Sequence, residues 1–176
     1  MRFAPLSAAL VLVSMALASR PAGAADGEPS FVPALRIGFG PSVHLSPKAD
    51  KGTDFAIDAT LGGSFWVPLK RRAGLVLGAE AGFAHDADAN AFNFALGFGA
   101  GHPAAYVAYH PHFLAGSSNG ATLFGMRNGI AMHVLWDMGS LEIAHEMTHY
   151  ADAWHQAVKF MFAVNPAAFV FALMKL

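Results

Sequence analysis

The 176-residue chain has no cysteine and few charged residues. Without cysteine, neither a disulfide framework nor a thiolate metal site can form. Only 13% of the residues are Asp, Glu, Lys or Arg and the formal net charge is −1, so nothing suggests a basic surface that binds nucleic acid. After residue 24 there is no run of 18 consecutive apolar residues, which argues against a transmembrane helix in the rest of the chain.

The first 24 residues have the features of a secretory signal peptide. Arg2 supplies a positive start, residues 6–18 form an apolar run, and Ala22-Gly23-Ala24 is a small-residue cleavage site. The apolar run is shorter than the roughly 20 residues that a bilayer-crossing helix needs. We therefore expect residues 1–24 to be removed on export and residues 25–176 to form one domain.

Beyond the leader, large apolar residues alternate with small or polar ones at a period of two, which is typical of β-strands. The chain is 55% hydrophobic and contains 18 glycines. In a soluble sandwich or lipocalin-like barrel the charged face is exposed, so charges should outnumber glycines on the polar face, and here they do not. The pattern favours a barrel whose outside meets lipid, because closed barrels and helices satisfy every backbone group there.

Eight stretches carry this alternation, an even number that suits a single-chain bacterial barrel. They cover residues 35–43, 55–65, 75–83, 92–99, 105–114, 124–136, 141–150 and 155–164. Four connections would lie on one rim and three on the other. We predict an all-β protein, an eight-stranded antiparallel transmembrane β-barrel that follows an N-terminal signal peptide.

Several charged residues fall on the small-residue face of these strands. The interior of an eight-stranded barrel is just wide enough for side chains to fill, so glycines offset the larger residues that project inward. Buried charges are tolerable there only when they are paired and hydrogen-bonded. The residues that we predict to face the barrel interior are Arg36, Asp58, Glu80, Arg127, Glu142, Glu146 and Lys159.

The last two strands allow a sharper prediction. If residues 151–154 form a four-residue loop, Tyr150 pairs with His155 and Glu146 stands directly opposite Lys159. Their side chains would then meet inside the barrel as a cross-strand ion pair. A register shifted by two residues is the alternative, and it keeps both side chains inward but makes the pair diagonal.

Over residues 32–165 this pattern resembles small bacterial outer-membrane barrels of the OmpA/OmpX architecture. The resemblance implies export to the outer membrane of a Gram-negative-type envelope. The implied partners are outer-membrane lipid and the chaperone and barrel-assembly machinery, without a cofactor. The predicted function is an envelope structural role or a narrow passage, with no catalytic site.

The carboxyl end departs from that family, whose members usually finish on a strand with a terminal aromatic residue. Here Asn165-Pro166 interrupts the last predicted strand, and an apolar tail, residues 167–176, follows it. The tail is either the true closing strand, which would change the strand count, or an interfacial segment.

A competing motif resembles the metzincin zinc proteases. The chain carries His145, Glu146, His149 and His155 at the family's positions, with Asp152 where the family has glycine. The resemblance implies Zn²⁺ bound by the three histidines and Glu146 as the general base on bound water, on a helix.

The alternative function is therefore a secreted zinc metalloprotease. We instead interpret this segment as a strand and predict that the protein is not an enzyme. The region upstream of the motif shows no long helical pattern, and only 21 residues follow His155. The strand interpretation has a cost of its own, since His145 and His149 would then face outward, towards lipid.

Overall fold

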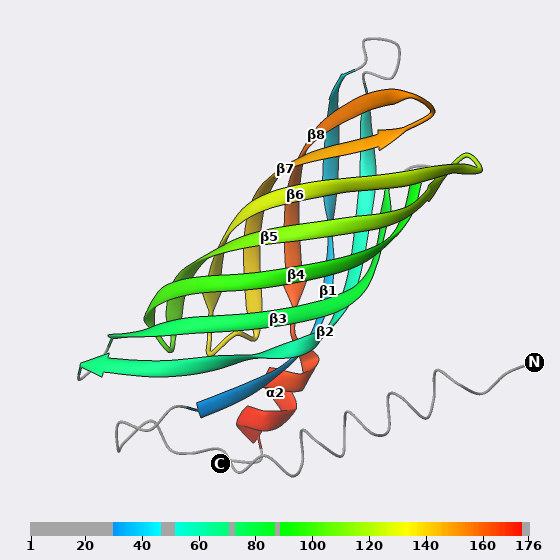
Figure 1. Ribbon diagram of the computed structural model, residues 1–176. Coiled ribbons are helices and arrows are strands. Elements are labelled where there is room, and N and C mark those ends of the chain that lie inside the picture. The colour runs from blue at the N-terminus through cyan, green and yellow to red at the C-terminus, as the bar shows by residue number, and fades with distance from the viewer. Residues whose placement is uncertain (1–29, 47–51, 71–72, 87–88, 174–176) are drawn as a thin grey trace, which may run out of the picture.

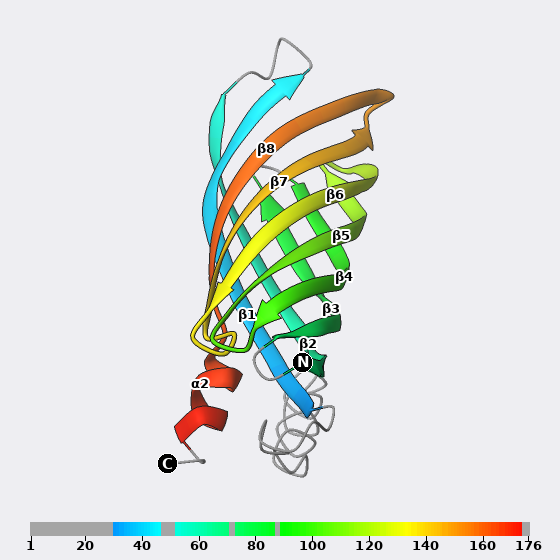
Figure 2. The same ribbon diagram turned by 90° about the vertical axis from the view of Figure 1, so that its left-hand side faces the viewer.

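The computed structural model describes residues 30–46, 52–70, 73–86 and 89–173, so the predicted signal peptide lies outside the described residues. Eight antiparallel strands close into a barrel in which each strand pairs with its sequence neighbours and the last pairs with the first (Figures 1 and 2). The strands are β1 (Ser30–Ser46), β2 (Thr53–Lys70), β3 (Ala73–Asp86), β4 (Ala89–His102), β5 (Ala105–Ser118), β6 (Ala121–Val134), β7 (Gly139–Tyr150) and β8 (Ala153–Val164). The predicted all-β, eight-stranded antiparallel barrel is confirmed.

The outer surface of the barrel is apolar. On β3, for example, Leu75 and Leu77 are exposed while Val76 between them is buried. The same alternation of exposed apolar residues with buried or half-buried ones recurs on the other strands. Soluble monomers rarely expose a contiguous apolar surface of more than a few hundred Å². This barrel instead carries exposed large hydrophobic side chains on every strand.

The two ends of the barrel differ. The carboxyl ends of β1, β3, β5 and β7 lie at one end, which we call the far rim (Figure 1). The carboxyl ends of β2, β4 and β6 lie at the opposite end, together with the helix α2, and we call this end the α2 rim. The predicted division into four and three connections therefore agrees with the fold.

The predicted four-residue loop between the last two strands is wrong. Tyr150 pairs with Ala153 rather than with His155. The turn consists of Ala151 and Asp152, whose φ angles are 49° and 60°. Positive φ at both central residues is the type I′ geometry, whose twist matches that of the flanking strands.

This shorter turn moves the register by two residues. Glu146 pairs with Ala157, and Lys159 pairs with Ala144. The contact between Glu146 and Lys159 is therefore diagonal, as in the alternative register, and their Oε2 and Nζ atoms are 3.0 Å apart.

The sixth strand begins before the predicted range, at Ala121, and ends two residues before the predicted end, at Val134. Leu135, Trp136 and Asp137 follow it with φ angles of 53°, 56° and 71°, so these residues form a turn instead of extending the strand. The Leu135 amide donates to the carbonyl of Ala104 in the neighbouring connection at 2.8 Å. This turn brings Asp137, which was expected in a connection, into a buried position.

The apolar tail forms the helix α2 (Pro166–Leu173) rather than a closing strand, so the strand count stays at eight. Oδ1 of Asn165 accepts hydrogen bonds from the amides of Ala168, at 3.2 Å, and Leu35, at 3.0 Å. Asn165 is thus an N-cap, and Pro166 follows at a position where its missing N–H costs nothing. In the described part of the chain, no helix is long and apolar enough to cross a membrane.

Gly40 permits a close approach of β1 to β8. A Cβ atom at position 40 would overlap the backbone carbonyl oxygen of Phe160. We expect Gly40→Ala to lower the free energy of unfolding by about 1–3 kcal/mol, because the two backbones must separate where the barrel closes. Urea unfolding of the purified protein in detergent or lipid would measure this.

The matched control is Gly38→Ala on the same strand and the same face. A Cβ at position 38 would lie 3.5 Å from the Cβ of Ala163, an ordinary van der Waals contact. Gly38→Ala should therefore leave the unfolding midpoint close to that of the unsubstituted protein. Equal effects of the two substitutions would contradict the proposed role of Gly40.

Candidate functional site

Polar and charged side chains fill the barrel interior. Within the described ranges, three cations and six carboxylates have buried or half-buried charged groups, so the interior has three more negative than positive charges when the histidines are neutral. The residues are Arg36, Arg127 and Lys159, and Asp58, Glu80, Asp86, Asp137, Glu142 and Glu146. They form two ion-pair networks and one histidine–carboxylate cluster.

The central network alternates in charge. The Arg127 guanidinium, 1% exposed, donates hydrogen bonds to Asp58 and, at 2.9 Å, to Oε2 of Glu146. Nζ of Lys159 lies 3.0 Å from the same Glu146 oxygen and 2.9 Å from Oδ2 of Asp86. The five residues come from five different strands. The network therefore pairs its buried charges and connects strands that are not neighbours.

A second network lies towards the α2 rim. Arg36 donates to Oε1 of Glu80 and to Oδ2 of Asp137, both at 2.6 Å, and Thr60 donates to the other Glu80 oxygen at 2.6 Å. Nδ1 of His133 lies 2.6 Å from Oδ1 of Asp137. Burial by itself would raise the pKa of the Asp137 carboxyl, but the nearby Arg36 charge and the His133 hydrogen bond outweigh it and lower the pKa to about 2.

The lowered pKa of Asp137 makes a prediction about stability. A carboxylate whose folded-state pKa is depressed stabilises the fold above its unfolded-state pKa, here 3.8, and loses that contribution as the pH falls towards about 2. We expect Asp137→Asn to cost about 2 kcal/mol of unfolding free energy at pH 7 and much less near pH 2. Unfolding midpoints of both proteins across this pH range would test it. A cost that does not change with pH would contradict this role.

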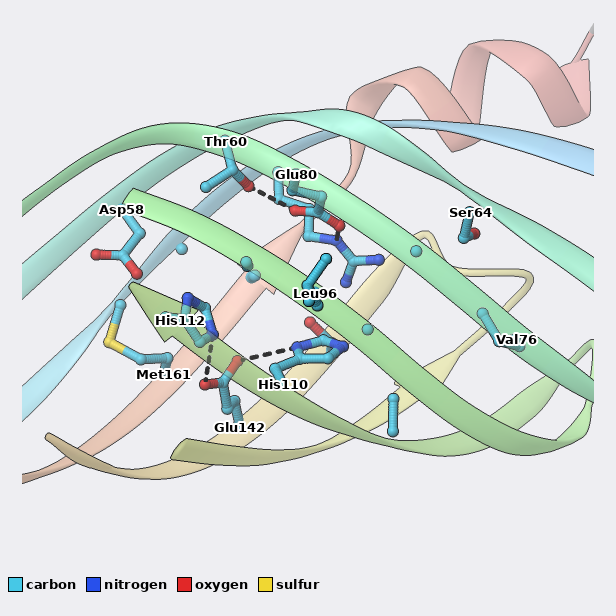
Figure 3. A pocket seen from close by; sticks show the side chains of 18 of the residues that line it. Asp58, Thr60, Ser64, Val76, Glu80, Leu96, His110, His112, Glu142 and Met161 are labelled. Carbon is cyan, nitrogen blue, oxygen red and sulfur yellow. Dashed lines mark hydrogen bonds and ion pairs between the residues drawn. The ribbon is translucent and has the colours of Figure 1, made fainter. Parts of the chain in front are cut away.

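The histidine–carboxylate cluster joins β5 to β7. Nδ1 of His110 lies 3.5 Å from Oε2 of Glu142, and Nε2 of His112 lies 3.4 Å from Oε1 of Glu142. Figure 3 shows both imidazole rings directed at the same carboxylate. On its other side, Nδ1 of His112 hydrogen-bonds to Oδ1 of Asn93 at 3.0 Å. Imidazole nitrogens and a carboxylate in this arrangement are potential ligands of a transition-metal ion.

A cavity of about 50 Å³ lies between this cluster and the second network. Figure 3 shows His110, His112 and Glu142 on one side of it and Glu80 with Thr60 on the other. The cavity is large enough for a water molecule, but its volume is far smaller than that of a ligand-binding pocket. The middle of the barrel is therefore filled by side chains.

A third group of polar residues lies near the far rim. Nε2 of His44 lies 3.0 Å from Oδ2 of Asp54 and 3.9 Å from Oδ1 of Asp86. These residues line a cavity of about 320 Å³ together with Tyr150 and His155, whose rings stack at 3.6 Å between centroids. The larger cavity of the interior is thus at the far rim and not in the middle.

The zinc-protease motif lies on strands and not on a helix. Because successive residues of β7 face opposite sides, Glu146 points inward while His145 and His149 lie on the outer face. His145 contacts Gln156, and His149 stacks against Phe124. His155 is buried inside, so the three histidines do not converge on one point. The geometry that the metzincin resemblance implies is not formed.

The structure places six of the seven sequence-predicted charges in the two interior networks and the seventh, Glu142, in the histidine–carboxylate cluster. Their side chains are between 1% and 15% exposed. Sequence reasoning missed Asp86 and Asp137, because both were assigned to connections. It also did not identify the meeting of His110 and His112 with Glu142. The sequence feature that could have indicated this cluster is the spacing of His110 and His112, two residues apart on one strand, which places both rings on the same face.

Fold and interior together define a class of protein: a closed, eight-stranded antiparallel β-barrel with an apolar outer surface and a charged interior filled by side chains. Comparisons of the chain with protein families, with curated proteins and with solved structures found no match.

Proposed function

We propose that the protein is an outer-membrane β-barrel of a Gram-negative-type envelope, with a structural role as a closed, lipid-embedded barrel. It is exported through a cleaved signal peptide and inserted with the help of chaperone and barrel-assembly machinery. Its partner on the outer surface is outer-membrane lipid. The observation that carries the proposal is that apolar residues face outward and charged residues face inward.

The distribution of polarity is the reverse of that in a soluble protein. The fully buried side chains with the largest volumes include Arg127, Lys159 and His133. Phenylalanine, isoleucine and leucine are exposed on the outer face instead. In water this arrangement would be unfavourable for two reasons: apolar side chains would be exposed to water, and charged groups would be buried away from it. A bilayer around the barrel removes the first cost, and pairing of the charges reduces the second.

Aromatic residues at the two rims support a membrane-spanning orientation. Trp136, in the β6–β7 turn, and Trp154, near the β7–β8 turn, are each exposed and lie at opposite ends of the barrel. Phe169 of α2 is also exposed, at the same rim as Trp136. Aromatic side chains are enriched where a barrel crosses the two membrane–water interfaces. The interfacial alternative for the apolar tail fits α2.

The packing of the interior favours a closed barrel with a structural role over a barrel that forms a narrow passage. The central network crosses the barrel, and its Arg127 and Lys159 side chains are 1% and 2% exposed. The cavity in the middle holds about 50 Å³ and shares no lining residue with the larger one at the far rim. In planar lipid bilayers, the purified protein should therefore give no single-channel currents. Regular conductance steps would overturn the closed role.

Membrane insertion can be tested with single cysteines, because the natural chain has none. A lipid-phase thiol reagent should label Cys at positions 77, 94 and 160, where Leu77, Phe94 and Phe160 are exposed on the outer face. Cys at Ala95, the buried neighbour of Phe94, is the matched control and should stay unlabelled. Labelling of position 95 alone, or of none of these positions, would overturn the proposal.

The proposal assigns no proteolytic role to the zinc-protease motif. We expect His145→Ala and Glu146→Gln to leave no proteolytic phenotype in cells. Loss of a proteolytic activity in both variants would favour the secreted metalloprotease instead.

A further inference from the structure

We infer that His110, His112 and Glu142 bind one divalent transition-metal ion of the zinc type inside the barrel. The ion would connect β5 to β7 across β6. This site differs from the zinc-protease motif, with which it shares no residue. It also does not depend on the membrane location of the barrel.

The spacing of the three side chains suits a metal ion. One ligand atom from each residue can be chosen so that all lie within 4.8 Å of one another. The two imidazole–carboxylate separations are 3.5 and 3.4 Å. Two ligand atoms at about 2.0–2.1 Å from a tetrahedral zinc ion lie roughly 3.3–3.4 Å apart. Small rotations of the side chains are enough to place an ion between them.

The hydrogen bond to Asn93 leaves His112 with a lone pair that faces the carboxylate. In the tautomer that suits this contact, Nδ1 of His112 donates to Oδ1 of Asn93, and Nε2 of the neutral ring is then an acceptor. Nε2 of His112 and Oε1 of Glu142 are buried, and neither has a hydrogen-bond partner among the described residues. Two acceptors facing each other at 3.4 Å repel unless a proton or a metal cation lies between them.

The Asn93 contact is also what a metal-binding histidine needs. Ligating histidines usually donate their second ring N–H to an oxygen, which holds the ring in place and makes the free nitrogen a better ligand. His112 is 6% exposed and Asn93 is fully buried, so this pair is held within the packed interior.

Gly129 of β6 makes room for the cluster. It pairs with His110 on one side and Ala144 on the other, so it lies between the two strands that carry the ligands. A Cβ at position 129 would overlap the Glu142 carboxylate. The adjoining cavity of about 50 Å³ can hold a water molecule as a fourth ligand.

The chemistry of the ligands selects the ion. Imidazole favours zinc, copper, nickel and iron, whereas magnesium and calcium prefer sites made only of oxygen. A divalent cation would also offset most of the negative charge excess of the interior. The expected effect is therefore a more stable barrel, with the largest gain in the contact of β5 with β7.

The test measures metal content of the full chain purified in detergent. The protein is refolded with Zn²⁺ or Co²⁺, passed over a desalting column and analysed by elemental mass spectrometry and visible absorption. We expect one ion per chain, absorption bands of four-coordinate Co²⁺, and a higher melting temperature than without metal. Mg²⁺ should produce none of these changes. No stoichiometric ion after refolding with either metal would overturn the inference.

Two substitutions test the ligands and two others serve as controls. Glu142→Gln keeps the side-chain volume and should abolish the Co²⁺ bands, as should His112→Ala. His145→Ala of the protease motif and His44→Ala of the far-rim cluster should each leave one ion bound. Loss of the ion in either control, with retention in Glu142→Gln, would place the metal elsewhere and overturn the assignment. Retained heat-modifiable migration in gels shows that each variant is folded.

Asn93→Leu tests the positioning of His112. This substitution keeps all three ligands and removes the oxygen that orients the ring. We expect it to weaken zinc affinity about 10–100-fold in a competition titration with a chromogenic chelator. An unchanged affinity in a folded Asn93→Leu protein would contradict the role given to the His112 lone pair.

Discussion

Arg127→Met is expected to lower the free energy of unfolding by about 3–5 kcal/mol, or to prevent folding in detergent altogether. Arg127 is 1% exposed, pairs with the Asp58 carboxylate and shares the Glu146 carboxylate with Lys159. Removing one partner of a buried ion pair leaves uncompensated charge in a medium that solvates it poorly. Urea unfolding in lipid vesicles, followed by the gel shift between folded and unfolded forms, would measure the loss.

A triple variant separates loss of pairing from loss of packing. Arg127→Met combined with Asp58→Asn and Glu146→Gln removes the charge on both sides, so most of the lost stability should return. Asp152→Asn in the exposed β7–β8 turn is the control, and it should change stability by no more than about 0.5 kcal/mol. If Arg127→Met were as mild as the control, the central network would not be a stabilising feature of the fold.

Ile143→Arg is expected to cost about 2–4 kcal/mol in a bilayer, the value for a cationic side chain that faces lipid near the midplane. Ile143 lies halfway along β7 and is 60% exposed. Its cross-strand neighbours are Ile130 and Phe160, which are also exposed. An arginine there would have no carboxylate beside it. Unfolding in lipid vesicles would give the cost.

The environment outside the barrel determines the size of this effect. An exposed substitution in water usually changes stability by no more than about 0.5 kcal/mol, so a small effect of Ile143→Arg would contradict the membrane proposal. Thr122→Arg, at the far-rim end of β6 and also exposed, is the matched control. Near an interface the cost of arginine falls to about 0–1 kcal/mol. A large cost at position 143 and a small one at position 122 are the expected results.

The turns show why register was harder to predict than strand number. Alternation of apolar and small residues indicates which side chains share a face, because the period of a strand is two. It does not indicate how many residues a turn contains. The Ala151-Asp152 turn adopts positive φ at both positions without glycine, so its length could not be recognised from residue type. The resulting error was two residues, which left every side chain on its predicted face.

The candidate metal site illustrates the same limit. His110 and His112 share a face by parity alone, and Glu142 faces inward by parity alone. Their meeting depends on the register of β5 with β6 and of β6 with β7, and on the space above Gly129. Neither the strand registers nor this space can be inferred from the alternation of residue types along the sequence. The zinc-protease motif was misleading for the opposite reason, because its spacing has meaning only on a helix.

The sequence by itself determined the all-β class, the eight strands and the face of the sheet on which each of the seven predicted charges lies. These properties follow from local alternation, which any strand expresses through its own backbone geometry. The tertiary structure alone decided which inward charges meet, that Asp86 and Asp137 join them, and that the tail becomes a capped helix. Contacts across a barrel depend on its closure and on the register of every hairpin, and each register is set by the geometry of a turn.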